Sequence, residues 1–307
     1  MGSNHKRPMR HFSPLRYPGG KGRLSPFVQR IFEDNNLLDG HYVEPYAGGS
    51  AVGLSLLLLE YASRIYINDI SKPVYLFWKA VLEDTDALCR KIRDKRVTPA
   101  EWRRQRNILF HYRDHSRVSV AFSMFFLNRT NRSGIIHSGG MIGGNDQTGE
   151  WKIDARYNKP ELIGRIEAIA AYSNRIRVSN KDAESFLKTI VPTLPKKSLV
   201  YLDPPYFEQG ESLYENHYLP DDHIRLAGVF RKKLRRNWMI SYDNHPQIRK
   251  AYRGCKKLVY LLPYSAARRY EGSEVIFFSD GLEVPRVKSP LSQFPLRDPA
   301  LKLLARV

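Results

Sequence analysis

One stretch decides the fold: Val200-Tyr201-Leu202-Asp203-Pro204-Pro205-Tyr206. The apolar run from Leu199 to Leu202 leads directly into a carboxylate, which is typical of a buried parallel strand with a polar group at its carboxyl end. Ligands of open α/β sheets bind outside the carboxyl ends of the strands. The two prolines fix φ twice and remove two backbone donors, so the turn is rigid and its carbonyls can accept hydrogen bonds. Together with the flat ring of Tyr206, these groups suit a planar ligand that carries an NH2 edge.

The tetrapeptide Asp203-Pro204-Pro205-Tyr206 matches the catalytic motif of amino-methyltransferases, which methylate exocyclic nitrogens of DNA bases. A strand end followed by a proline turn would give the same four letters. Further motifs occur in the right order, and from Leu15 to about Gly281 the chain resembles the D12 class of adenine-N6 DNA methyltransferases, which includes the bacterial Dam enzyme. The resemblance implies a Rossmann-like α/β sheet, catalytic roles for these four residues, and S-adenosyl-L-methionine as methyl donor, with Asp203 also near that donor.

Composition limits the function classes that need to be considered. The 307 residues are 42% hydrophobic, which allows a large core, and the net charge of +19 suits a polyanion such as DNA or RNA. A basic protein without such a partner would carry the same charge. With only Cys89 and Cys255, neither a disulfide framework nor a cysteine zinc site is expected, and we expect no metal. No apolar run approaches the ~20 residues of a membrane span and no signal peptide is visible, so we expect a cytoplasmic protein without membrane contact.

The segment Leu15-Arg16-Tyr17-Pro18-Gly19-Gly20-Lys21 predicts a tight loop. Its paired glycines allow backbone amides to approach a ligand closely, Lys21 can meet a carboxylate, and Tyr17 can pack on a ring. An ordinary surface turn could have the same composition. The family resemblance implies that Tyr17 and Lys21 touch the methyl donor, with Tyr17 standing where many relatives carry tryptophan.

Residues His41 to Gly53 predict a strand, a glycine-rich turn and a helix. Since Gly48 and Gly49 are adjacent, the segment lacks the G-x-G-x-x-G spacing of dinucleotide-binding proteins. It resembles the family's donor-binding motif instead, which implies donor contacts for Glu44, Tyr46, Gly48 and Gly49.

Two acidic residues follow predicted strands. Asp69 ends the strand Arg64–Asp69, about twenty residues after the glycines, where an acidic side chain can bind ribose hydroxyls. Asp182 follows the strand Arg175–Ser179, and the resemblance places it near the adenine of the donor. Either residue could instead serve as the N-cap of the helix that follows it.

The stretch from Ser71 to about Ala171 is helical in pattern and interrupts the alternation of strands and helices. Helices are expected over Lys72–Leu82, Ala100–Tyr112 and Val118–Leu127. The predicted domains are a methyltransferase core of residues 10–70 and 173–283, an inserted, mainly helical target-recognition domain of residues 71–172, and a basic, proline-containing surface tail of residues 284–307.

Residues Asn128–Gly134 and Ser138–Asn145 are polar, basic and rich in glycine, and they show no periodicity. A flexible loop would look the same. The resemblance implies a DNA-contacting loop, with Arg129, Asn131 and Arg132 as nucleic-acid-binding candidates. The start of this loop matches Dam-like chains, whereas the residues after it do not, so the GATC target is not carried over.

Beyond the motif, Phe207–Tyr218 resembles the loop that covers a flipped base in the family. Arg268 and Arg269 lie in a predicted loop suited to phosphate contacts. The remaining predicted elements are a helix over Asp221–Arg235 and strands over Trp238–Tyr242, Lys257–Leu262 and Glu274–Phe278.

The function that these patterns favour is site-specific methylation of adenine N6 in double-stranded DNA. Asp203 and the Pro204 carbonyl would accept the hydrogens of the amino group, and Tyr206 would stack on an adenine that has left the duplex. Three alternatives remain open: a cytosine-N4 methyltransferase, an RNA amino-methyltransferase, and an inactive DNA-binding relative. A cognate restriction endonuclease is a further partner that the family allows, and neither the target sequence nor the oligomeric state is predicted.

Overall fold

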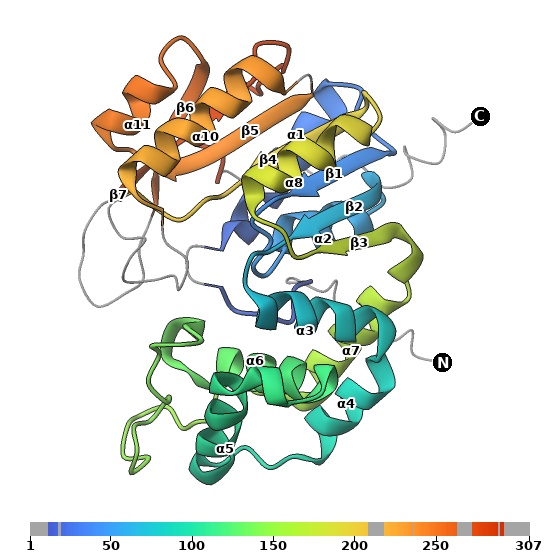
Figure 1. Ribbon diagram of the computed structural model, residues 1–307, viewed down its shortest axis with the longest axis vertical. Helices are drawn as coiled ribbons and strands as arrows, with labels where there is room; N and C mark the ends of the chain where they lie inside the picture. Colours follow the sequence, from blue (N-terminus) through green and yellow to red (C-terminus); the bar gives the residue numbers. More distant parts are fainter. Residues whose placement is uncertain are drawn as a thin grey trace, which may run out of the picture.

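A seven-stranded sheet organises the chain, with the strand order β3-β2-β1-β4-β5-β7-β6 (Figure 1). The computed structural model describes residues 12–17, 20–207, 218–234, 236–262, 272–287 and 289–291. The strands are β1 (Gly40–Glu44), β2 (Ala62–Asn68), β3 (Ile176–Ser179), β4 (Ser198–Leu202), β5 (Asn237–Asp243), β6 (Lys256–Leu262) and β7 (Gly272–Phe278). All pairings are parallel except those of β7, which runs antiparallel to both β5 and β6. The Rossmann-like methyltransferase sheet expected from the sequence is confirmed.

Successive side chains of β4 enter two different cores, because neighbouring residues of a strand point to opposite faces. Leu199 and Tyr201 belong to the first core, and Val200 and Leu202 belong to the second. All of β4 is buried, which explains why its sequence is continuously apolar. Helices α1 (Ser25–Asp34) and α2 (Ala51–Leu58) contribute to the first core, together with the helical layer described below. Helices α8 (Ala183–Thr189), α10 (Pro220–Lys233) and α11 (Pro246–Ala251) contribute to the second.

A layer of helices connects β2 to β3 and lies below the sheet in Figure 1. Its members are α3 (Lys72–Glu83), α4 (Thr85–Asp94), α5 (Pro99–Phe110), α6 (Arg117–Thr130) and α7 (Lys159–Ala170). The centre of this layer is α6, whose residues from Val120 to Asn128 are all buried. The predicted run of apolar residues in α6 is therefore core, as its composition indicates.

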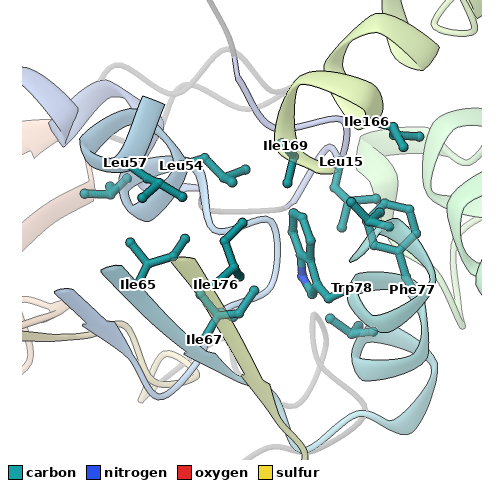
Figure 2. Packing of buried hydrophobic residues seen from close by; sticks show 14 of the residues in the cluster. Leu15, Leu54, Leu57, Ile65, Ile67, Phe77, Trp78, Ile166, Ile169 and Ile176 are labelled. Atoms are coloured by element: carbon teal, nitrogen blue, oxygen red, sulfur yellow. The ribbon is translucent and has the colours of Figure 1, made fainter. Parts of the chain in front are cut away.

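The helical layer and the sheet share one hydrophobic core. Figure 2 shows the two sides meeting. The helical layer contributes Phe77 and Trp78 of α3 and Ile166 and Ile169 of α7. The other side contributes Leu54 and Leu57 of α2, Leu15 from the segment before Tyr17, and the strand residues Ile65, Ile67 and Ile176. This packing fixes the helical layer against the carboxyl edge of the sheet.

Three expectations need correction at the edges of elements. The helix expected over Ala100–Tyr112 ends at Phe110, because the chain passes into a 3-10 turn over Tyr112–Asp114. The sequence prediction also left two helices without bounds: α7, and α4, whose apolar positions are few and spaced among many charges. The expected surface tail is partly packed: Val284, Val287 and Leu291 contact the first core.

Residues after β7 are also tied down by an amide side chain. Asn35 donates from Nδ2 to the carbonyl of Glu283 at 2.8 Å, and its Oδ1 accepts from the amide of Glu283 at 2.7 Å. Within the described part of the chain, no helix is long and apolar enough to cross a membrane.

Candidate functional site

A cavity of about 610 Å³ lies at the carboxyl edge of the sheet, beyond the ends of β1, β2 and β4. This volume is within the range of small-molecule and cofactor sites. Every residue that the sequence nominated for donor binding contributes to its lining: Tyr17, Lys21, Glu44, Tyr46, Gly48, Gly49, Asp69, Asp182 and Asp203. The fold therefore brings together residues from five separate stretches of the sequence.

The glycine turn after β1 needs glycine for two reasons. Gly48 has φ of +43°, a left-handed conformation that other residues adopt at a cost. The Tyr17 ring also lies so close that a Cβ atom at Gly48 would be 2.9 Å from two ring carbons. The turn is anchored to the helical layer as well, because Nε1 of Trp78 in α3 donates to the Gly48 carbonyl at 3.0 Å.

Glu44 forms the base of this turn and is 6% exposed. Its carboxylate accepts from Tyr42 Oη at 2.9 Å, from the Gly53 amide at 3.3 Å, and from Ser50 Oγ. Burial raises the pKa of Glu44 to about 7, although these hydrogen bonds oppose the rise. The observed role of Glu44 is to hold strand, turn and helix together; a direct contact with the donor stays a prediction.

Asp69 joins the glycine turn to the start of α3. Oδ1 accepts from the Ser71 amide at the start of α3, and Oδ2 accepts from the Gly48 amide, each at 2.9 Å. The N-cap of α3 is Ser71, so Asp69 is not the helix cap that was considered as its alternative role. Burial raises the pKa of Asp69 to about 6. Each carboxylate oxygen has a second lone pair, so a ribose contact stays a prediction.

Asp182 and Tyr46 complete this side of the cavity. Asp182 is the N-cap of α8 and accepts from the Ser185 amide at 3.1 Å. The Tyr46 and Tyr218 hydroxyls lie 2.7 Å apart, with their rings edge to face at 6.0 Å. Tyr218 also lines the cavity, and the sequence analysis did not nominate it for donor binding.

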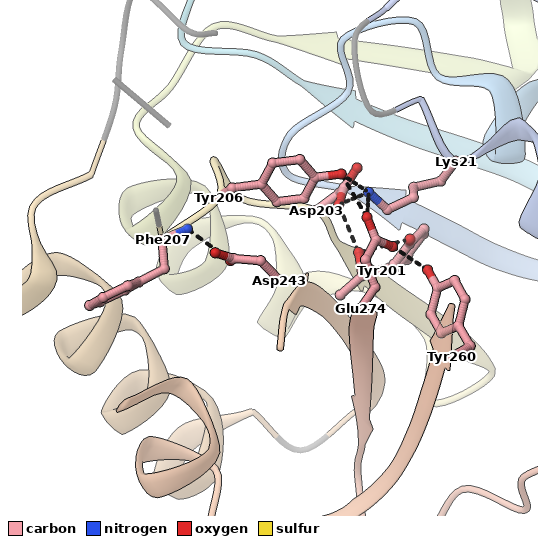
Figure 3. Close-up of polar contacts among 9 residues, drawn as sticks. Lys21, Tyr201, Asp203, Tyr206, Phe207, Asp243, Tyr260 and Glu274 are labelled. Atoms are coloured by element: carbon pink, nitrogen blue, oxygen red, sulfur yellow. Dashed lines mark hydrogen bonds and ion pairs between the residues drawn. The ribbon is translucent and has the colours of Figure 1, made fainter. Parts of the chain in front are cut away.

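Asp203 follows β4 and is held by one of its two oxygens (Figure 3). Ser241 Oγ donates to Asp203 Oδ1 at 2.7 Å, and Lys21 Nζ lies 3.0 Å from the same oxygen. Among the described residues, none donates a hydrogen bond to Oδ2, and the Pro204 carbonyl likewise accepts none. Two acceptors are therefore left at the end of the strand, as the motif predicts.

A second carboxylate lies behind Asp203, and the sequence analysis missed it. Glu274 Oε1 is 3.3 Å from Lys21 Nζ and accepts from the Tyr206 hydroxyl at 2.7 Å, while Oε2 accepts from the Tyr260 hydroxyl. Burial opposes the charge of Lys21, but the Asp203 and Glu274 carboxylates outweigh it and raise the pKa of Lys21 well above its usual value. A glutamate inside the apolar strand Glu274–Phe278 was the signal that could have identified this residue.

Tyr206 is more enclosed than the motif suggested. The side chain is 5% exposed, and its hydroxyl also accepts from Lys21 Nζ at 3.1 Å. Burial raises the pKa of the Tyr206 hydroxyl. Stacking on a base stays a prediction, and it requires the ring to be uncovered; the hydrogen-bonding role of the hydroxyl was not foreseen.

Asn131 was predicted to contact nucleic acid, and in the described structure its side chain is buried and engaged within the protein, so this contact stays a prediction. The residue is 1% exposed; its Oδ1 accepts from Trp102 Nε1 at 2.6 Å, and its Nδ2 donates to the carbonyls of Ile135 and Ile136. Every hydrogen-bonding atom of the side chain is occupied inside the protein. The observed role of Asn131 is to hold the shape of the loop.

The predicted arginines differ in their surroundings. Arg129 is partly buried and donates from Nε to the Arg156 carbonyl at 2.8 Å, whereas Arg132 is exposed. Burial, followed by the charges of Arg16 and Arg165, lowers the pKa of Arg129 to about 10. The candidates Arg268 and Arg269, and the loop residues 208–217, lie outside the described residues.

Arg16 connects this region to the donor side through its backbone. Its amide donates to Asn128 Oδ1 at 2.8 Å, and its carbonyl accepts from Asn128 Nδ2 at 2.5 Å. Asn128 is 0% exposed. The segment before Tyr17 is thereby fixed to the end of α6, next to the glycine-rich loop.

Comparison with known proteins agrees with this geometry. The chain is similar to the type II methyltransferase M.MjaIII of Methanocaldococcus jannaschii, with 25% identity over 254 residues that cover 75% of this chain and 83% of that protein. The family model of D12 class N6 adenine-specific DNA methyltransferases matches residues 17–264, from the Tyr17 loop through the Asp203 motif to the end of β6. The resemblance drawn from the sequence is confirmed, and adenine N6 in DNA takes precedence over the cytosine and RNA alternatives. The chain belongs to the D12 class N6 adenine-specific DNA methyltransferase family.

Proposed function

We propose that this DNA adenine methyltransferase binds S-adenosyl-L-methionine in the cavity at the carboxyl edge and presents adenine N6 to Asp203. The observation that carries the proposal is the convergence of all the nominated donor-binding residues, together with Asp203, on one cavity. In this proposal Asp203 is both part of the wall of the donor site and the first residue of the catalytic motif.

The shape of the cavity fits such a donor. The Gly48 turn leaves room that a side chain would fill, and its backbone approaches the cavity directly. Asp69 lies where ribose hydroxyls can be bound, and Ile70, which is 49% exposed in the structure, offers apolar surface for a purine ring in the same lining. When bound, the donor supplies an electrophilic methyl group on a sulfonium sulfur.

Residues of the motif would prepare the adenine amino group for transfer. Its nitrogen is a poor nucleophile because the lone pair is delocalised into the ring. Asp203 Oδ2 and the Pro204 carbonyl would accept its two hydrogens, which favours a pyramidal nitrogen and aligns it for attack. As the nitrogen gains positive charge its proton becomes acidic, and Asp203 Oδ2 is placed to accept it.

We propose that residues 71–172 act as the target-recognition domain and that the loop after α6 reaches the extruded base. Residues Gly134, Ile135, Ile136, His137 and Ser138 of this loop line the same cavity as Asp203. The exposed Arg132 precedes them, so it is the loop arginine best placed to face DNA. Recognition and catalysis would then meet at one cavity.

A cationic cluster supports DNA binding beside this loop. Arg16, Arg129 and Arg156 influence one another electrostatically: burial and Arg156 lower the pKa of Arg16, just as burial and Arg16 lower that of Arg129. No carboxylate forms an ion pair with any of these three among the described residues. We propose that a DNA phosphate supplies the missing negative charge.

The test is base-resolution mapping of methylated positions in DNA from a host that expresses the protein. We expect N6-methyladenine at one defined sequence with the wild-type protein and none with Asp203→Ala. Methylation at cytosine N4, or full methylation by Asp203→Ala, would contradict the proposal. Because its relative M.MjaIII is a type II methyltransferase, we also propose a cognate restriction endonuclease as partner; protection of host DNA from a co-expressed nuclease would test this.

A further inference from the structure

Glu274 is a buried carboxylate that the motif chemistry does not use. It lies on β7, is 2% exposed, and is followed by the buried apolar residues Val275 to Phe278. A charge in such a place is costly unless donors surround it. Three donors do so, from three other parts of the chain: Lys21, Tyr206 and Tyr260. Three side chains thus hold this carboxylate next to the site (Figure 3).

The charges around Lys21 do not cancel. Its ammonium lies 3.0 Å from Asp203 Oδ1 and 3.3 Å from Glu274 Oε1. In the described part of the chain, no other cation forms an ion pair with either carboxylate. Asp203 with Lys21 alone would be neutral overall, whereas the three groups together carry one net negative charge.

We propose that Glu274 is a positioning residue for methyl transfer. It shares the Lys21 ammonium with Asp203, so that the Lys21 charge does not fully neutralise Asp203 and negative charge remains toward the adenine amino group. It also fixes the Tyr206 ring through the hydrogen bond from the Tyr206 hydroxyl. This inference rests on the proposed role of Asp203. Positive charge develops on the amino nitrogen during transfer, so a net negative group nearby stabilises the transition state more than the ground state.

The pKa of Asp203 gives the inference a signature. Burial and the Glu274 carboxylate raise this pKa, whereas Lys21 and Ser241 oppose the rise. The other titratable groups around this pair are the hydroxyls of Tyr201, Tyr206 and Tyr260, whose pKa values burial raises, so they stay neutral. Removing the Glu274 charge should therefore lower the pKa of Asp203, even though it slows the reaction.

The experiment is single-turnover methyl transfer to duplex DNA by full-length Glu274→Gln, at saturating donor and DNA, across pH. Glutamine keeps the size of the side chain and removes its charge. We expect the plateau rate to fall roughly ten- to a hundredfold, the effect of one nearby charge in a partly desolvated site. The acidic limb of the profile should move to lower pH, while donor affinity and melting temperature stay near wild type.

Three variants complete the design. Glu274→Asp keeps the charge, so its rate should lie between those of Glu274→Gln and wild type. Tyr260→Phe also keeps the charge and should lower the rate less than Glu274→Gln does. The control is Glu283→Gln, at an exposed carboxylate after β7, whose rate should equal that of wild type. If Glu274→Gln fails to fold, the other two variants decide. The inference would be overturned if the pH–rate profile of Glu274→Asp were identical to that of wild type while the rates of Tyr260→Phe were lower at all pH values. An unchanged Glu274→Gln rate, or a lower rate without a shift of the acidic limb, would also overturn it. Loss of methylation by the wild-type protein would instead be a failure of the proposed function.

Discussion

Ser241 on β5 donates a hydrogen bond of 2.7 Å to Asp203, which directly follows the neighbouring strand β4. The same Ser241 hydroxyl lies 3.0 Å from that of Tyr201, so it is fixed on both sides. Because this bond uses Oδ1, it orients the carboxylate and leaves Oδ2 without a hydrogen-bond donor among the described residues. The pairing of β4 with β5 thus determines how the Asp203 carboxylate is oriented.

Ser241→Ala should reduce activity and shift its pH dependence in the direction opposite to Glu274→Gln. The Ser241 bond lowers the pKa of Asp203, so its loss raises that pKa. Ionised Asp203 then requires a higher pH, and the acidic limb moves upward. A lost hydrogen bond to a charged group corresponds to roughly tenfold or more in rate near neutral pH. Single-turnover rates across pH measure both effects, and an acidic limb that stays in place would exclude the proposed role of Ser241.

Glu44→Gln should make the stability of the protein less dependent on pH. The pKa of Glu44 rises from 4.5 to about 7 on folding, so the folded state binds a proton more tightly than the unfolded state between these values. The wild-type free energy of unfolding therefore falls as pH rises from about 4.5 to 7, by up to roughly 3 kcal/mol from this group. Denaturant titrations at several pH values should show a flatter curve for Glu44→Gln, and parallel curves would contradict the assignment.

Tyr206→Phe should be intermediate between wild type and Tyr206→Ala. The hydroxyl bonds Lys21 and Glu274, so its loss disturbs the charge arrangement, whereas the ring remains for stacking. Removing the ring as well should cost a further ~1–3 kcal/mol in the step that needs the extruded adenine. Single-turnover methylation of DNA with a fluorescent adenine analogue at the target separates base extrusion from transfer. Equal damage in the two variants would mean that the hydroxyl alone matters.

Arg16→Gln should weaken DNA binding alike on all sequences and reduce the slope of log K against log salt by about one. The Arg16 backbone holds Asn128, but no hydrogen bond or ion pair to its guanidinium occurs among the described residues, so the fold should tolerate the change. The matched control is Arg253→Gln, an exposed arginine before β6, at the opposite edge of the sheet from the cavity. Equal slopes for Arg16→Gln and wild type would remove the phosphate contact.

Asn131→Ala should lower stability and leave the target sequence unchanged where activity remains. The substitution leaves the Trp102 indole and two loop carbonyls without their partner, which typically costs ~1–3 kcal/mol. Replacing residues 135–140 while keeping Asn131 should instead change the methylated sequence, because this part of the loop reaches the cavity. Thermal unfolding and base-resolution mapping separate the two outcomes. A changed map for Asn131→Ala would restore it as a reader.

Local sequence predicted the sheet and the cavity wall well, because both are set by local signals. The apolar run before Asp203 and the glycines after Glu44 each specify a strand and its turn without reference to distant residues. The partners of Asp203 are set by pairing across the sheet: Ser241 by β4 and β5, and Glu274 by the antiparallel β7. Spacing along the chain does not predict such neighbours. An acidic residue in an apolar strand does indicate a position where the fold has to supply a hydrogen-bond donor.

For Asn131, the sequence led to an expectation of exposure, whereas the structure shows a buried side chain. Its loop is polar and basic, so composition favoured a solvent-facing reader, but Trp102 of α5 covers it and uses its amide. Burial of a single polar residue within a polar loop depends on the packing of a helix elsewhere, which a loop's own composition cannot reveal. The composition of the tail likewise did not reveal that Val284, Val287 and Leu291 pack against the first core.

Two asparagine side chains form paired hydrogen bonds to a backbone segment, as a neighbouring strand would. Asn128 pairs with both the amide and the carbonyl of Arg16, and Asn35 does the same with Glu283. Hydrolysis of either amide to a carboxylic acid barely changes its size, yet at neutral pH it would replace a donor by a second oxygen and turn half of each pair from attraction into repulsion. Asn128 is shielded from water and Asn35 is not. Chemical ageing of this enzyme should therefore first loosen the segment after β7 and spare the junction beside the active site.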